Sequence, residues 1–147
     1  MESYSKKVEI RWSDLDPNFH IRHSVYYDFG AYVRMCFLTE NGLGAPVLLE
    51  NNLGPILFRE ECVFKREIHF GDQVYIDLLL KQCSRNYSRW TFQHRIMKDG
   101  DTLAAIITVD GAWLDTNRRR LTVPTEVVTP TFEKLPKADD FKWIERG

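Results

Sequence analysis

The sequence has few cysteines, and they are not arranged to pair with one another. Its 147 residues contain three, which are widely spaced and never form a C-x-x-C motif: Cys36, Cys62 and Cys83. A disulfide framework usually has an even set of cysteines in a small secreted chain, and a zinc site has closely spaced ligand pairs. We therefore expect reduced, buried thiols and a cytoplasmic protein.

Neither sign of charge is in excess, and no apolar run is long. The 20 basic and 21 acidic side chains give a formal net charge of −1, whereas nucleic-acid binding favours a basic excess. The longest apolar region, around residues 25–38, is interrupted by Asp28 and Arg34 and is too short to cross a bilayer. The opening stretch MESYSKKVEI does not resemble a signal peptide. We expect neither nucleic acid nor a membrane as a partner.

The chain also lacks internal repeats, low-complexity tracts and linkers. With 44% hydrophobic and 28% charged residues, its composition is that of an ordinary globular protein. A chain of this length can bury one core of normal size. We therefore expect a single domain over residues 1–147.

The periodicity of apolar residues predicts one strand and then one long helix. Val8, Ile10 and Trp12 alternate with charged residues, which is typical of a strand with one buried face. From Ser24 the spacing becomes helical, and apolar residues cover nearly every face, as in a helix buried on several sides. Ser24 is the expected N-cap, and the stretch NGLG at 41–44 supplies the stop signals.

The rest of the chain reads mainly as strands joined by tight turns. Period-two alternation predicts strands at 62–70, 74–81, 90–97 and 103–114, with turn signals at Gly71-Asp72 and Asp99-Gly100. The tail beyond Arg120 contains three prolines and is expected to be extended and irregular. The predicted class is α+β, with an antiparallel five-stranded sheet and one long buried helix.

The stretch RWSDLDPNFHIRHSVYY, residues 11–27, crowds acids and histidines between the first strand and the helix. It contains Asp14, Asp16, Pro17 and His20 in the order of a D-x-D-P-x-G-H motif, with Phe19 in place of the glycine. With the following helix, the turn FGDQV at 70–74 and the segment RRRLTVP at 118–124, it resembles the 4-hydroxybenzoyl-CoA thioesterase-like family of hotdog-fold acyl-CoA thioesterases. The likeness covers nearly the whole chain.

The resemblance implies a sheet wrapped around the helix and hydrolysis of an acyl-CoA thioester. Asp16 would act as a nucleophile or as a general base on water, and the backbone amides of His23 and Ser24 would form an oxyanion hole. From the residues alone, Asp16 could equally accept loop hydrogen bonds, and Ser24 could simply cap the helix. There are three alternative functions: hydrolysis of an acyl-carrier-protein thioester, non-catalytic binding of an acyl thioester, and dehydration of a hydroxyacyl thioester.

The resemblance also assigns residues that contact the substrate. These are Pro17, Phe19, His20 and Tyr26, and His20 could equally be a structural hydrogen-bonding residue. The resemblance also implies a homodimer or homotetramer with active sites at the dimer interface. Guanidinium groups suit phosphate oxygens, so Arg118, Arg119 and Arg120 are weaker candidates for the phosphates of coenzyme A, or else form a solvated turn.

No cofactor or metal is expected from the sequence. The loop offers oxygen and nitrogen ligands in Asp14, Asp16, His20 and His23, but their spacing follows no familiar site. His69 and His94 have no evident link to the loop.

Overall fold

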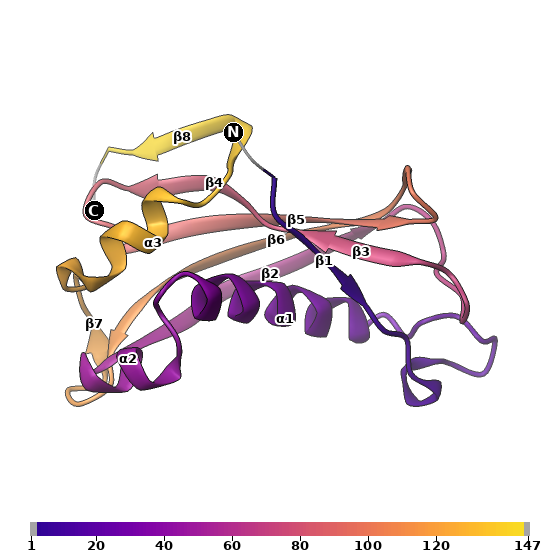
Figure 1. Ribbon diagram of the computed structural model, residues 1–147, viewed down its shortest axis with the longest axis horizontal. Coiled ribbons are helices and arrows are strands. Elements are labelled where there is room, and N and C mark those ends of the chain that lie inside the picture. The colour runs from indigo at the N-terminus through magenta and orange to yellow at the C-terminus, as the bar shows by residue number, and fades with distance from the viewer. Residues whose placement is uncertain (1–2, 146–147) are drawn as a thin grey trace.

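The computed structural model describes residues 3–145, which form a curved, mainly antiparallel sheet against one long helix (Figure 1). The strands are β1 (Ser5–Val8), β2 (Leu53–Phe64), β3 (Val74–Asp77), β4 (Leu79–Ser84), β5 (Arg89–Lys98), β6 (Thr102–Asp115), β7 (Arg120–Leu121) and β8 (Lys137–Ile144). The helices are α1 (Val25–Glu40), α2 (Ala45–Glu50) and α3 (Thr129–Glu133), with short 3-10 turns at Trp12–Asp14 and Glu126–Val128. The predicted α+β class is confirmed.

The sheet contains eight strands within the described residues, instead of the predicted five. β5 pairs with β6 along one edge, and along the other edge it pairs with β4 and then with β3. The expected strand 74–81 is interrupted at Leu78. Beside it, side-chain atoms enter the ladder between β3 and β5: His94 Nδ1 bonds to the carbonyl oxygen of Asp77, and the N–H of Arg95 donates to the Asp77 carboxylate. Since β1 joins β3 and β8 joins β4, the sheet is still only five strands wide.

The proline-rich tail is ordered, which corrects the expectation of an irregular segment. Pro130 lies in the first turn of α3, where the missing N–H of proline costs no helical hydrogen bond. The carbonyl of Pro136 accepts a hydrogen bond from Leu80 N–H, and β8 then runs parallel to β4. The prolines thus mark the ends of elements.

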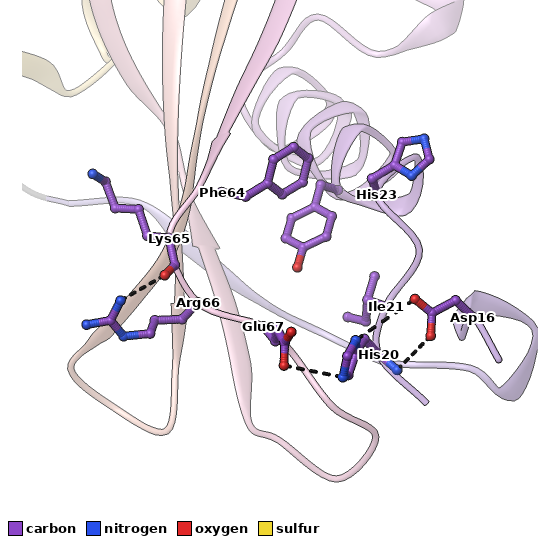
Figure 2. Close-up of a pocket in the computed structure, with 9 residues that line it drawn as sticks. Asp16, His20, Ile21, His23, Phe64, Lys65, Arg66 and Glu67 are labelled. Atoms are coloured by element: carbon purple, nitrogen blue, oxygen red, sulfur yellow. Dashed lines mark hydrogen bonds and ion pairs between the residues drawn. The ribbon is translucent and has the colours of Figure 1, made fainter. Parts of the chain in front are cut away.

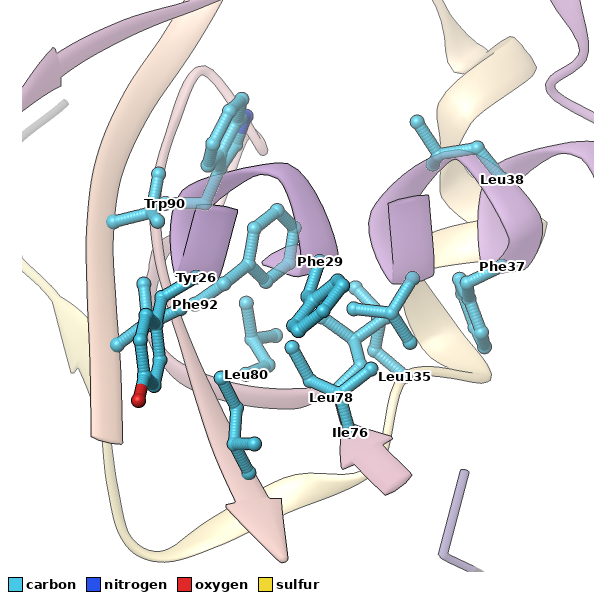
Figure 3. Close-up of a cluster of buried hydrophobic side chains, with 14 of the residues drawn as sticks. Tyr26, Phe29, Phe37, Leu38, Ile76, Leu78, Leu80, Trp90, Phe92 and Leu135 are labelled. Atoms are coloured by element: carbon cyan, nitrogen blue, oxygen red, sulfur yellow. The ribbon is translucent and has the colours of Figure 1, made fainter. Parts of the chain in front are cut away.

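Helix α1 occupies the concave side of the sheet, as its apolar character predicts. Phe29, Val33 and Phe37 are almost fully buried and recur at helical spacing, facing side chains of β3, β4 and β5 (Figure 3). Ser24 is the N-cap residue, but its side chain makes no capping hydrogen bond. All three cysteines are free thiols, and only Cys83 is fully buried, whereas partial exposure of the other two departs from the expectation.

A buried polar bridge ties α1 to the sheet. His94, on β5, is completely buried, with Nδ1 2.9 Å from the carbonyl oxygen of Asp77 and Nε2 2.9 Å from Nη1 of Arg34. Arginine can only donate, so Nε2 accepts and the ring proton is on Nδ1. Burial, and then the nearby charge of Arg34, lowers the pKa of His94 to about 3, so the ring is neutral.

Gly111, on β6, lies opposite Trp90 of β5 and leaves room for its indole ring. A Cβ atom there would overlap the indole ring of Trp90 and the carbonyl oxygen of Ile56. Trp90 in turn packs edge-on against Trp113, with ring centroids 6.3 Å apart. The absence of a side chain at this position is therefore a packing requirement.

We expect Gly111→Ala to lower the free energy of unfolding by about 3 kcal/mol, because overpacking at this site cannot be relieved without moving backbone. Chemical denaturation would measure the change. Gly44→Ala is the matched control, since a Cβ there would meet its nearest atom at an ordinary 3.8 Å. Equal stabilities of the two variants would contradict this account.

We also expect stability to depend on the protonation of His94. An unfolded histidine takes up a proton below a pKa of about 6.5, and folded His94 does so only near 3, so the unfolded state gains protons first as the pH falls. The free energy of unfolding should then decrease by about 1 kcal/mol per pH unit below pH 6.5. Urea unfolding between about pH 6.5 and 5 would show a shallower slope for His94→Gln. Identical slopes would refute the assignment.

Candidate active site

The loop between β1 and α1 is anchored by a buried carboxylate. Asp14 is 1% exposed, and its two oxygens accept hydrogen bonds from the backbone N–H and from the guanidinium of Arg11, at 2.9 and 2.8 Å. Burial opposes its ionisation, but the hydrogen bonds and charge of Arg11 outweigh that effect and lower the pKa of Asp14. Its carbonyl also accepts the N–H of Arg22 at 2.8 Å, which closes the loop.

The same loop is fastened to the segment that follows β2. The N–H of Ile21 donates to the carbonyl of Ile68 at 2.9 Å, and His20 lies directly opposite His69 in an antiparallel bridge. The expectation that His69 has no link to the loop is therefore wrong. Because of these contacts, the loop, the start of α1 and residues 64–69 surround one space.

Asp16 has one carboxylate oxygen engaged by the loop. Oδ1 accepts the backbone N–H groups of Asn18 and His20, at 2.8 and 3.1 Å. The second oxygen, Oδ2, lies 4.0 Å from Nδ1 of His20, and about a third of the side chain is exposed. Oδ1 of Asp16 thus has the loop-stabilising role. Oδ2 is directed toward His20 at the pocket (Figure 2).

Phe19 adopts a left-handed backbone conformation, with φ of 64°. This conformation suits glycine, so the loop geometry accounts for the glycine of the motif at this position. The Phe19 ring is 58% exposed and lies 6.0 Å from the ring of Trp12. Pro17 is exposed as well, and neither residue lines the pocket.

The pocket beside Asp16 has a volume of about 340 Å³ (Figure 2). Its lining residues come from the loop, the start of α1 and the end of β2: Asp16, His20, Ile21, His23, Tyr26, Phe64, Lys65, Arg66 and Glu67. Tyr26 packs edge-on against Phe64 at 4.9 Å, and burial raises its pKa to about 12, so the hydroxyl stays protonated. Four of the predicted site residues therefore line one pocket: Asp16, His20, His23 and Tyr26.

The start of α1 presents backbone donors near the pocket. Among residues 3–145, the N–H groups of His23 and Ser24 make no hydrogen bond within the chain. Helix N-termini leave such groups unpaired and carry partial positive charge. The Ser24 hydroxyl lies 3.4 Å from the guanidinium of Arg22, so it does not compete for these amides.

Three polar lining residues were not identified from the sequence. Lys65 and Glu67 fit the polar side of the alternating pattern that predicted a strand through residue 70, whereas Arg66 stands at an apolar position of that pattern. β2 ends instead at Phe64, because the N–H groups of Lys65 and Arg66 both donate to the carbonyl of Ala104. That shared acceptor turns the chain out of the ladder toward the loop.

Arg118, Arg119 and Arg120 lie at the other end of the sheet. Phe64 pairs with Ala105 at the beginning of β6, whereas Arg120 pairs with Asp115 at its end. Ten residues of strand correspond to roughly 30 Å, so the three arginines do not reach the pocket of their own chain.

A second cavity, of about 210 Å³, lies between α1 and the sheet. Its walls are mostly apolar: Ala31, Arg34, Met35, Leu38, Pro55, Leu57, Trp90, Phe92, Trp113 and Phe132. The indole nitrogens of Trp90 and Trp113 are buried and have no hydrogen-bond partner in the described part of the chain.

None of the helices formed by residues 3–145 is both long and apolar enough to span a membrane.

No curated protein matches the chain. Many solved structures share the fold, among them three at low identity. The Staphylococcus aureus protein SAV2348, solved in complex with CoA, aligns with a TM-score of 0.84 and 18% identity over 98% of this chain and 90% of that one.

The other two are named as thioesterases. Slr0204 of Synechocystis, a 1,4-dihydroxy-2-naphthoyl-CoA thioesterase, aligns with a TM-score of 0.79 and 13% identity over 91% of this chain and 98% of its own. The DHNA-CoA thioesterase of Staphylococcus aureus gives 0.78 and 14%, over 91% and 88%. These likenesses establish the fold that the sequence motif implied.

The family model of the thioesterase-like superfamily matches residues 10–132, which include the loop, α1 and most of the sheet. The chain therefore belongs to the thioesterase-like superfamily and has its hotdog fold.

Proposed function

We propose that the protein hydrolyses an acyl-CoA thioester at the pocket beside Asp16. One observation carries the proposal: an accessible carboxylate oxygen and the unpaired amides of His23 and Ser24 belong to the same short loop and helix start. Thioester hydrolysis needs a group that attacks or activates water and donors for the developing oxyanion. The CoA bound to SAV2348 and the names of the two DHNA-CoA thioesterases support this substrate class.

In the proposed reaction, Asp16 either attacks the thioester carbon to form an acyl anhydride or removes a proton from the attacking water. In both routes the carbonyl oxygen becomes negative and is stabilised by the amides of His23 and Ser24. The C–S bond then breaks, and the thiolate leaves and takes up a proton. In the first route water hydrolyses the anhydride, which releases the acid and restores the Asp16 carboxylate, and in the second route the attacking water supplies the second oxygen of the acid. His20 and Tyr26 would contact the substrate, while Pro17 and Phe19 would contact it only at the outer rim.

The phosphates of CoA need cationic partners. Lys65 and Arg66 line the pocket and are the nearest basic side chains to propose for this role within one chain. We therefore propose Lys65 and Arg66 for this role in preference to Arg118, Arg119 and Arg120 of the same chain.

We further propose that the active unit is a homodimer joined along β2, with homotetramers formed by pairing of dimers. Within the described residues β2 pairs only with β6, so its outer edge offers backbone groups over twelve residues. Phe58, Val63 and Phe64 expose about half of their side chains along this strand. Such an edge is suited to pairing with a second copy.

Antiparallel pairing of two β2 strands would also complete the site. It would set the end of β2 in one subunit beside the beginning of β2 in the other. Leu53 begins β2 and pairs with Asp115, which in turn pairs with Arg120. Arg118, Arg119 and Arg120 of the partner subunit would then approach the pocket that holds Lys65 and Arg66, and could bind the CoA phosphates there.

The hydrolase proposal is tested by free-thiol release from a panel of short, medium, long and aryl acyl-CoAs. We expect Asp16→Asn to reduce the rate by at least about a hundredfold. The amide oxygen can still accept the loop hydrogen bonds of Asp16, so the loss would report the chemistry. Asp139→Asn, an exposed substitution on β8, is the control and should keep the full rate.

Other outcomes favour the alternatives. Equal rates for Asp16→Asn and wild type would refute the role of Asp16. Binding of CoA without thiol release would indicate a non-catalytic module, and loss of water from a hydroxyacyl thioester would indicate a dehydratase. Faster release from a carrier-protein thioester than from the matching acyl-CoA would reassign the substrate.

The dimer proposal predicts that Phe58→Lys raises the dimer dissociation constant by at least about tenfold in analytical ultracentrifugation, because two like charges would meet near the middle of the paired strands. Tyr75→Lys is the control, since Tyr75 is 42% exposed on β3, which β5 and β6 separate from β2. A wild-type monomer, or a Phe58→Lys dimer of unchanged strength, would refute the interface.

A further inference from the structure

His20, Glu67 and His69 project from two neighbouring segments toward one point. His20 and His69 are directly opposite each other in the antiparallel bridge that fastens the loop. Cross-strand neighbours point to the same side, and so do residues two apart along an extended segment, which brings Glu67 to the side of His69. The two imidazole rings meet edge-to-face with centroids 4.8 Å apart.

The distances between the potential ligand atoms of these side chains are close to those in a metal site. Nε2 of His20 lies 3.3 Å from Oε2 of Glu67, and Nε2 of His69 lies 3.7 Å from the same oxygen. One ligand atom from each residue falls within 4.8 Å of the others. Ligands bound at 2.0–2.1 Å around a tetrahedral zinc ion are about 3.4 Å apart, so small side-chain rotations would suffice.

The outer nitrogen of each histidine also faces a carboxylate. Nδ1 of His20 lies 4.0 Å from Oδ2 of Asp16, and Nδ1 of His69 lies 3.9 Å from Oδ2 of Asp72. The position of Asp72 is fixed, because the same oxygen accepts the backbone N–H of His69 at 2.8 Å. Histidines that bind metals through one nitrogen commonly donate the other to such an acceptor, which fixes the ring and the tautomer.

We propose that His20, Glu67 and His69 bind a divalent transition metal ion of the zinc class, with water as a fourth ligand. Two imidazoles and one carboxylate favour such an ion over Mg²⁺ or Ca²⁺, which take oxygen ligands. Asp16 and Asp72 lie beside the outer nitrogens of the two histidines and orient the rings. The sequence alone did not indicate this triad, because His69 is far along the chain from the loop.

The metal-site proposal is independent of the proposed hydrolase activity, because its test measures only the binding of Zn²⁺. Protein without a histidine tag would be freed of metal with a chelator and titrated with Zn²⁺ in competition with a chromophoric chelator. We expect one Zn²⁺ per chain. His69→Gln and Glu67→Gln should each weaken binding by about a hundredfold or more, and Asp72→Asn by about tenfold.

His23→Gln is the matched control, because it removes another histidine of the same pocket that is outside the triad. Thermal unfolding followed by circular dichroism checks that each variant folds. Added Zn²⁺ should raise the unfolding temperature of wild type and of His23→Gln, and should leave that of His69→Gln unchanged. The proposal is overturned if wild type binds no stoichiometric Zn²⁺, or if His69→Gln binds it as tightly as His23→Gln.

Discussion

The hydrogen bond from Ile21 N–H to the carbonyl of Ile68 joins the loop before α1 to the chain after β2. Both side chains are buried, so the contact combines a backbone bond with apolar packing. On the far side of the loop, Asp14 and Arg11 hold the chain in a closed turn. Between these two attachments lies Asp16, whose position is fixed without a regular strand or helix, and α1 begins at Val25, just beyond the second attachment.

The side chain of Asp16 combines a loop-stabilising role with the proposed catalytic role. Its Oδ1 accepts two loop amides, and these bonds orient the carboxylate while its Oδ2 stays toward His20. A carboxylate that is held by backbone donors loses little rotational freedom on binding a substrate. The loop-stabilising and catalytic interpretations of this residue are therefore compatible.

The sequence predicted the features that depend on local pattern. The limits of α1 and the strands β5 and β6 follow from periodicity and turn residues, and the D-x-D-P motif marked the loop. The burial of α1 was predicted correctly only for one side, because Tyr32 and Met35 are exposed. The sequence did not predict the end of β2, because the shared acceptor Ala104 is distant in sequence. Nor did it predict that His20 faces His69, or that Arg118, Arg119 and Arg120 lie at the opposite end of β6, since both depend on strand register.

The two buried indoles at the cavity under α1 give the protein an optical property. The Nε1 groups of Trp90 and Trp113 are buried donors with no partner in the described chain, and an unpaired buried donor carries an energetic cost. Both rings also form part of the cavity wall. Indole emission is sensitive to its surroundings, so the cavity carries its own fluorescent reporter of anything that repacks its walls.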